Sequence, residues 1–148
     1  MNLNEQLRDQ MKVSMRAKDK ERLKTIRMAL AAVKQREIDE RITLNDDDVL
    51  AILVKMVKQR RDAAKQFEDA NRQDLADIEL QEITVIEEFL PKPLTSDEVD
   101  SLIKAAIEQA GATSMQEMGK VMAILKPQVQ GRADLGKISG LIKAAFSA

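Results

Sequence analysis

The stretch Leu90-Pro91-Lys92-Pro93-Leu94 separates two runs of helical periodicity in a sequence of 148 residues. A residue that precedes proline avoids helical backbone dihedrals, and two closely spaced prolines stiffen the connection between two elements. Neither side of this stretch shows the alternation that is typical of strands. We therefore expect an all-α fold of about seven helices in two packed subdomains. The N-terminal subdomain should hold four helices in residues 1–90, and the C-terminal subdomain three helices in residues 91–148.

Before the prolines, apolar residues recur every three or four positions, as in amphipathic helices. Two helices are predicted from this spacing, one with Leu3, Leu7, Met11 and Met15 inward and one with Leu23, Ile26, Leu30 and Val33 inward. Asn45 and the aspartates after it are typical of a helix N-terminus, with Leu44 and Val49 spaced as a hydrophobic staple. That helix should reach about Phe67, and a fourth should cover about residues 74–89. The fourth helix is expected to carry Leu75, Ile78, Ile86 and Phe89 on one side.

After the prolines, capping signals predict three more helices. Thr95-Ser-Asp-Glu98 has the pattern of a capping box, and Gly111 suits the left-handed residue that ends a helix. Ser114-Met-Gln-Glu117 predicts a second capping box, and Pro127 should kink or end the helix that follows. Asp134 is expected to cap the last helix. The inward side chains predicted for that helix are Ile138, Leu141, Ile142, Ala145 and Phe146.

Composition excludes several chemistries. The chain has no Cys and no His, so a disulfide, a structural zinc site and a Cys or Ser–His nucleophilic pair cannot be built from it. No catalytic residue, metal or other cofactor is predicted. The sequence has no apolar run of about 18 residues, as a membrane span requires, and no apolar signal region at its N-terminus. We therefore expect a cytoplasmic protein with no membrane contact. We find no low-complexity tract and no internal repeat.

Charge is unevenly distributed along a chain whose formal net charge is −1. Residues 8–41 hold eleven Lys or Arg against six acids, and residues 68–88 hold eight acids against Arg72 alone. Residues 111–148 hold only Glu117 and Asp134 as acids, so their local excess is +3. A basic terminal segment on a near-neutral chain suggests a module that meets an anion. The basic residues of this segment are Lys120, Lys126, Arg132, Lys137 and Lys143.

Four motifs in this order resemble the GatB/YqeY family over essentially the whole chain, in its free-standing YqeY-like branch. They are Gln66-Phe-Glu-Asp-Ala-Asn-Arg-Gln-Asp-Leu-Ala76, Glu88-Phe-Leu-Pro-Lys-Pro-Leu94, Gly119-Lys-Val-Met122 and Gly131-Arg-Ala-Asp134. In this family the same module forms the tail of GatB, the tRNA-engaging subunit of the glutamine-dependent tRNA amidotransferase. The resemblance implies a helical fold in two parts, a link to tRNA or other RNA, and a family-level carbon–nitrogen ligase activity with glutamine as amido-N-donor. One departure is Leu135, which precedes Gly136 where many relatives have glycine directly after the motif.

The first functional hypothesis is a non-catalytic, tRNA- or RNA-associated module that uses the five basic residues of the C-terminal segment. Two observations weigh against it: the sequence pI is about 5.6, and the chain has almost no aromatic side chain to stack on bases. The alternative is that these lysines are solvated surface. We interpret the motif residues as structural, namely Gly119, Gly131, Asp134 and Gly136. Gly119 and also Gly140 should permit close helix packing, and Gly131 and Gly136 should form turns. Asp134 should cap the last helix.

Two other hypotheses remain open. An amidotransferase would need a Cys or a Ser–Ser–Lys centre and a nucleotide pocket, and this chain has scattered serines and no glycine-rich phosphate loop. We predict no turnover by the isolated chain, while an accessory role in amidation within a complex stays possible. A protein-interaction module could use the eight methionines as an adaptable groove, although gap-filling in a core poor in aromatics is the simpler interpretation. The expected partners are RNA or a protein, and no DNA is expected.

Overall fold

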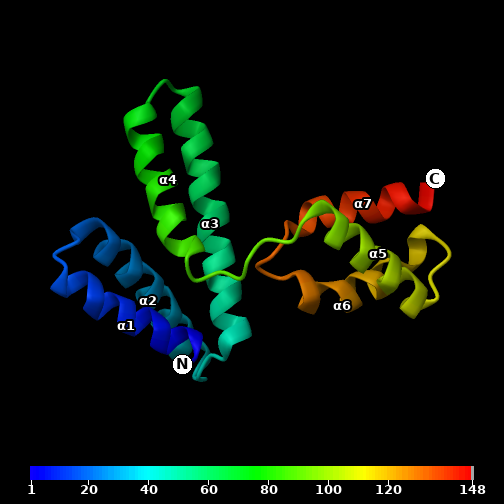
Figure 1. Cartoon of the computed structure of the whole chain (residues 1–148), viewed down its shortest axis with the longest axis horizontal. Helices are drawn as coiled ribbons and strands as arrows, with labels where there is room; N and C mark the ends of the chain where they lie inside the picture. Colours follow the sequence, from blue (N-terminus) through cyan, green and yellow to red (C-terminus); the bar gives the residue numbers. More distant parts are fainter. Residues whose placement is uncertain (148) are drawn as a thin grey trace. The chain divides into compact units, whose positions relative to one another are not determined.

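The computed structural model describes residues 1–147, and these are helical wherever they are regular (Figure 1). The elements are α1 (Leu3–Arg16), α2 (Lys20–Glu40), α3 (Asp46–Asp69), α4 (Gln73–Glu87), α5 (Ser96–Ala110), a 3-10 turn η1 (Met115–Glu117), α6 (Met118–Val129) and α7 (Leu135–Ser147). The prediction of an all-α fold is confirmed. The chain divides into two compact units at the proline segment, unit 1 (Met1–Leu90) and unit 2 (Pro91–Ala148). None of the described helices has the length and apolarity needed to cross a membrane.

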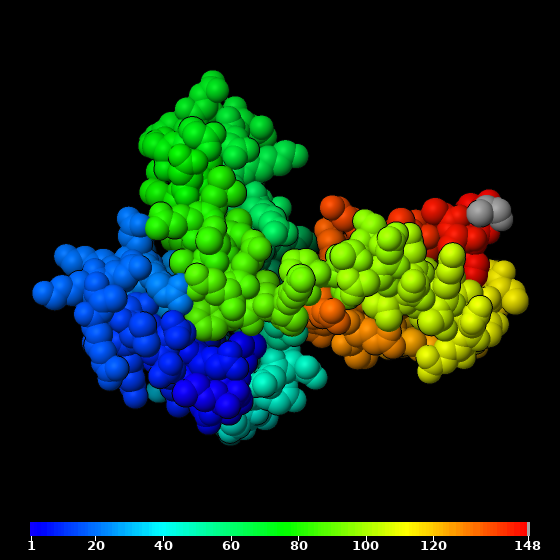
Figure 2. All heavy atoms as spheres, in the orientation of Figure 1, coloured from blue at the N-terminus to red at the C-terminus, as the bar shows by residue number. Residues whose placement is uncertain are grey.

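Unit 1 consists of two helical hairpins, α1–α2 and α3–α4. Helix α3 has 24 residues and is therefore about 36 Å long. Its far end and the start of α4 extend beyond α1 and α2 (Figure 2). Where the hairpins meet, an aliphatic core forms around the fully buried side chains Leu7, Ile26, Val33, Val49, Leu53 and Ile86.

The N-terminus of α3 has the predicted cap. The Asn45 side chain accepts a hydrogen bond from the Asp48 amide at 2.9 Å, and the Asp48 carboxylate accepts one from the Asn45 amide at 3.3 Å. Leu44 and Val49 are both buried, as the staple requires. A neighbouring carboxylate, Asp46 Oδ1, accepts from the Leu3 amide at 2.9 Å and so ties the start of α1 to α3.

Two side chains predicted to face inward in unit 1 are exposed instead. Ile78 is 51% exposed because α4 turns its Ala76 side toward α3, and two residues correspond to about 200° of rotation on a helix. Met15 is 49% exposed because the buried side of α1 runs through Leu7 and Ser14, and Met15 lies about 100° from Ser14.

Unit 2 consists of α5, α6 and α7 around a core of Val121, Leu125, Val129, Ile138 and Ile142 with Val99 and Ile103. The capping box of Thr95 and Glu98 is present, with the Glu98 amide donating to Thr95 Oγ1 at 3.2 Å. Gly111 ends α5 with a φ of 64°, as predicted. Helix α6 passes through Pro127 and ends two residues later, at Val129. Proline has no N–H to donate, but in the last turn of a helix this removes only one hydrogen bond.

Two predictions in unit 2 are wrong. Ser114 makes no side-chain cap, because the chain enters the tighter 3-10 turn η1, and Glu117 accepts from Thr113 Oγ1 at 3.4 Å instead. On α7, Leu141 is 43% exposed and Ala145 is exposed as well. The centre of the buried side of α7 lies between Ile138 and Ile142, and Leu141 is about 80° around the helix from that centre. The four-residue spacing of Ile138 and Ile142 therefore describes the buried side better than the mixed three- and four-residue spacing that we predicted.

Candidate nucleic-acid interface

Helices α6 and α7 repeat one twelve-residue pattern. Met118–Val129 and Leu135–Phe146 align without gaps, contrary to the expectation of no internal repeat. Both stretches begin with an apolar residue and Gly-Lys, and both carry a second lysine six positions after the first. Burial repeats too, since the pairs Val121/Ile138 and Leu125/Ile142 are buried. Six equivalent pairs face solvent: Gly119/Gly136, Lys120/Lys137, Ala123/Gly140, Lys126/Lys143, Pro127/Ala144 and Gln128/Ala145.

The four lysines of the repeat, Lys120, Lys126, Lys137 and Lys143, are all exposed. None of them has an ion-pair partner among residues 1–147. Within each helix the two lysines are six residues apart, which corresponds to about 240° of rotation, so they lie on different flanks. The two lysines of α6 therefore do not share a helix face, and neither do the two lysines of α7.

Arg132, the fifth basic candidate, has a different environment. It is half-buried, and its Nε donates to the Lys92 carbonyl at 3.3 Å. Its own carbonyl accepts from the Leu94 amide at 2.8 Å. Arg132 thus fastens the α6–α7 turn to the segment before α5, which is a structural role within unit 2.

The turn before α7 depends on Gly131 and Asp134. Gly131 has a φ of 76°, which favours glycine, and Asp134 Oδ1 accepts from the Gly136 amide at 2.8 Å. A Cβ added to Gly136 would lie 3.2 Å from that same oxygen, so a small residue suits this position. The extra Leu135 becomes the first residue of α7, and the cap is kept.

The other two glycines do not have the role that we expected. A Cβ added to Gly119 or to Gly140 would meet no atom within 4 Å. The prediction that these two glycines allow close helix packing is therefore wrong within unit 2. Both positions lie on the exposed side of the repeat, next to its lysines.

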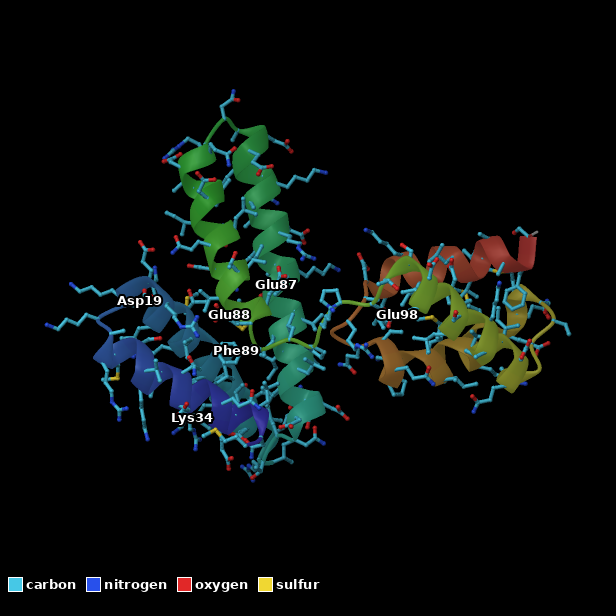
Figure 3. The ribbon with its side chains drawn as sticks, viewed as in Figure 1. Asp19, Lys34, Glu87, Glu88, Phe89 and Glu98 are labelled. Atoms are coloured by element: carbon cyan, nitrogen blue, oxygen red, sulfur yellow. The ribbon has the colours of Figure 1, made fainter. Side chains whose placement is uncertain are left out.

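Four of the eight acids in the acidic stretch of unit 1, residues 68–88, are paired with arginine. Arg60 Nε donates to Glu82 at 2.8 Å, and both side chains are nearly buried, at 10% and 14% exposure. Glu87 and Glu88 are neighbours at the end of α4 (Figure 3). Glu87 pairs with Arg61, and Glu88 pairs with Arg22. The other four acids of the stretch, Glu68, Asp69, Asp77 and Glu79, have no ion-pair partner among residues 1–147.

An exposed pair closes the α3–α4 turn. Arg72 donates to both oxygens of Asp74, at 3.1 and 3.0 Å. The hydrogen bond from Arg72 lowers the pKa of the Asp74 carboxyl below its ordinary value of 3.8, and the same bond raises the pKa of Arg72. Within residues 1–147, no three acidic side chains come close enough to hold a metal ion.

The methionines fill the core less than the simpler interpretation requires. Met56 is buried, and Met11, Met118 and Met122 pack at the edges of the two cores. The remaining four are exposed, namely Met1, Met15, Met28 and Met115.

Comparison with known proteins places the chain in a family. The model of the YqeY-like protein family matches residues 4–146. A Kluyveromyces lactis protein named altered inheritance of mitochondria protein 41, mitochondrial, is 32% identical over 96% of this chain and 75% of its own length. Proteins of the same name from Vanderwaltozyma polyspora and Clavispora lusitaniae are 33% and 38% identical, over 76% and 62% of this chain. The matches span 64% and 54% of those two proteins' lengths, respectively. This chain belongs to the YqeY-like family.

Proposed function

We propose that this protein is a non-catalytic helical module that associates with tRNA or other RNA through α6 and α7. The observation that carries the proposal is the repeat, which exposes Lys120, Lys126, Lys137 and Lys143 at matching positions without ion-pair partners in the described chain. Membership of the YqeY-like family supports it, because the resemblance to the amidotransferase tail implies a link to tRNA.

The proposed contact reads the phosphate backbone. The chain has no Trp and no Tyr, so stacking on bases contributes little, and lysines bind phosphates as point charges. Because the lysines of one helix lie on different flanks, any one RNA strand meets one lysine from a helix at a time. Binding is therefore expected to be shape-dependent and to weaken steeply with salt.

The test is an electrophoretic-mobility titration of total tRNA at low and at moderate salt. Two variants change equivalent positions of the repeat, Lys120→Glu/Lys137→Glu and Lys126→Glu/Lys143→Glu. Each should reduce the salt slope by about two, one unit for each lost phosphate contact. The control, Lys58→Glu/Lys65→Glu, makes the same charge change at exposed lysines of α3 that have Asp62 between them. Wild-type protein that does not bind tRNA in either buffer would overturn the proposal.

We also propose that the protein is located in an aqueous compartment that contains tRNA. The fungal relatives carry the word mitochondrial in their names, whereas the sequence alone led us to expect the cytoplasm. Both compartments contain tRNA, so the RNA proposal does not depend on the choice. Immunoblotting of fractionated cells decides between them.

A further inference from the structure

Helix α2 carries a denser row of cations than the C-terminal segment. Between Lys20 and Lys34 it holds five basic residues against Glu21 alone. Four of the five are exposed and lie within a sector of about 80° on the helix surface, since they are spaced by four, three and seven residues. We call these four residues the α2 stripe: Lys20, Lys24, Arg27 and Lys34.

The acids nearest in sequence are used elsewhere. Glu21 accepts from the Gln81 side chain at 2.6 Å, and the remaining basic residue, Arg22, pairs with Glu88. Asp19 caps α2 by accepting from the Arg22 amide at 3.2 Å. No residue of the α2 stripe has an ion-pair partner among residues 1–147. The stripe is thus a row of four cations without ion-pair partners in the described part of a chain of net charge −1.

The same side of α2 is open to solvent and is formed by residues of α2 alone, namely Lys20, Leu23, Lys24, Arg27, Met28 and Ala31. The Met28 sulfur lies 3.8 Å from Arg60 Nη2 of α3, which connects one edge of this surface to the core ion pair. The cations therefore stand on the open face of one helix, where an extended ligand can reach them.

We infer that the α2 stripe is a second phosphate-binding surface, in unit 1, for the backbone of an RNA strand. The inference rests on the proposed function for the identity of the polyanion. The stripe runs from Lys20 to Lys34, about 21 Å along the helix, which suits a linear ligand with regularly repeated charges. No aromatic side chain lies among the residues of this surface, so the contact is with phosphate and carries no base sequence.

The arrangement of apolar side chains favours a phosphate backbone over a partner helix or a lipid surface. Leu23 and Met28 lie outside the two edges of the sector, and the only apolar residue inside it between Lys20 and Lys34 is the small Ala31. An acidic amphipathic helix needs a central apolar stripe on the surface that it packs against, and a helix that inserts into a membrane needs one on its own face. One alanine methyl group does not form such a stripe, and the other positions of the sector are charged.

The test uses the full chain with Lys24→Glu/Arg27→Glu, two exposed positions in the middle of the stripe. Total tRNA is titrated at several salt concentrations, with Lys58→Glu/Lys65→Glu as the matched control. The stripe variant should bind about tenfold or more weakly at low salt and lose about two units of salt slope, while the control keeps the wild-type slope. Circular dichroism should give the same melting midpoint for all three proteins, because the four changed side chains are exposed.

The outcomes separate the two proposals. If wild type binds tRNA and the stripe variant binds equally well, the inference about α2 is wrong while the proposed function of α6 and α7 stands. Equal losses in the stripe variant and the control would mean that only net charge matters, which also overturns it. Vesicles of phosphatidylglycerol provide a further arm, and a variant that loses vesicle binding but keeps tRNA binding would show that the stripe receives lipid and not RNA.

Discussion

Units 1 and 2 are both helical bundles with aliphatic cores, but they treat charge differently. Every ion pair among residues 1–147 lies in unit 1, and every one of them uses arginine. The described part of unit 2 is held by apolar contacts, caps and the hydrogen bonds of Arg132. The planar guanidinium forms directed pairs with carboxylates, whereas the ammonium group of lysine remains hydrated on the surface. Arginine thus makes the ion pairs within the described chain, and lysine supplies most of the positive charge that is left unpaired.

The largest effect should come from Arg60→Ala, which breaks the most buried ion pair. Removing one partner leaves Glu82 nearly buried without its counter-charge, and we expect a loss of about 3 kcal/mol in the free energy of unfolding. Urea unfolding followed by circular dichroism measures the loss, since the chain has no Trp or Tyr for fluorescence. Hydrogen exchange should show faster opening in residues 1–90 and unchanged protection in unit 2.

A double variant, Arg60→Met/Glu82→Leu, is the control for this comparison. Two apolar side chains of similar volume should restore most of the lost stability, because a buried pair gains little over good packing. If the double variant is as unstable as Arg60→Ala, then the pair contributes through specific geometry, and the contrast between a charged unit 1 and an apolar unit 2 becomes sharper.

A smaller effect of the opposite sign is expected in unit 2. Gly140 lies in the interior of α7 with open space around it, so Gly140→Ala should raise the free energy of unfolding by about 1 kcal/mol. Gly119→Ala lies in the first turn of α6 and should raise it by about half as much. Thermal melting followed by circular dichroism detects both changes.

The same two variants also measure function. A glycine that nothing in the protein contacts is explained if a ligand approaches the backbone there. On the proposed function, Gly119→Ala should weaken tRNA binding although it stabilises the fold. Unchanged binding in both variants would separate the glycines from the lysines beside them, and a loss of stability would contradict the open space that the structure shows.

The fold could be predicted well from the sequence because the signals that begin and end its helices are local. Asn45, Thr95, Gly111 and Asp134 determine helix ends through hydrogen bonds and dihedrals that depend on a few neighbouring residues. Which side of a helix is buried depends on the neighbouring helices, and for this reason Ile78 and Leu141 were assigned to the wrong side.

The candidate site was harder to predict, for the same physical reason. Counting charges pointed to residues 111–148, but only the structure shows that Arg132 is used internally. The six-residue spacing of Lys120 and Lys126 already predicted that they would not share a helix face. The α2 stripe was hidden inside a segment that also contains Glu21 and Arg22, and these two turn toward α4. The four-, three- and seven-residue spacing of its cations was a signal in the sequence that could have revealed it.

The smallest effect should come from the exposed pair of Arg72 and Asp74, which tests whether burial is what distinguishes the pairs of unit 1. The pKa of Asp74 is lowered in the folded protein, so its contribution to stability is complete above the ordinary value of 3.8 and is lost as the pH falls through the lowered value. Asp74→Asn removes this dependence, so the wild type should lose slightly more stability than the variant between neutral pH and strongly acidic pH. Both side chains are largely solvated, at 56% and 64% exposure, and the difference in melting midpoint should be barely resolvable. A difference as large as that of Arg60→Ala would mean that the geometry of the α3–α4 turn, and not burial, decides which ion pairs stabilise this unit.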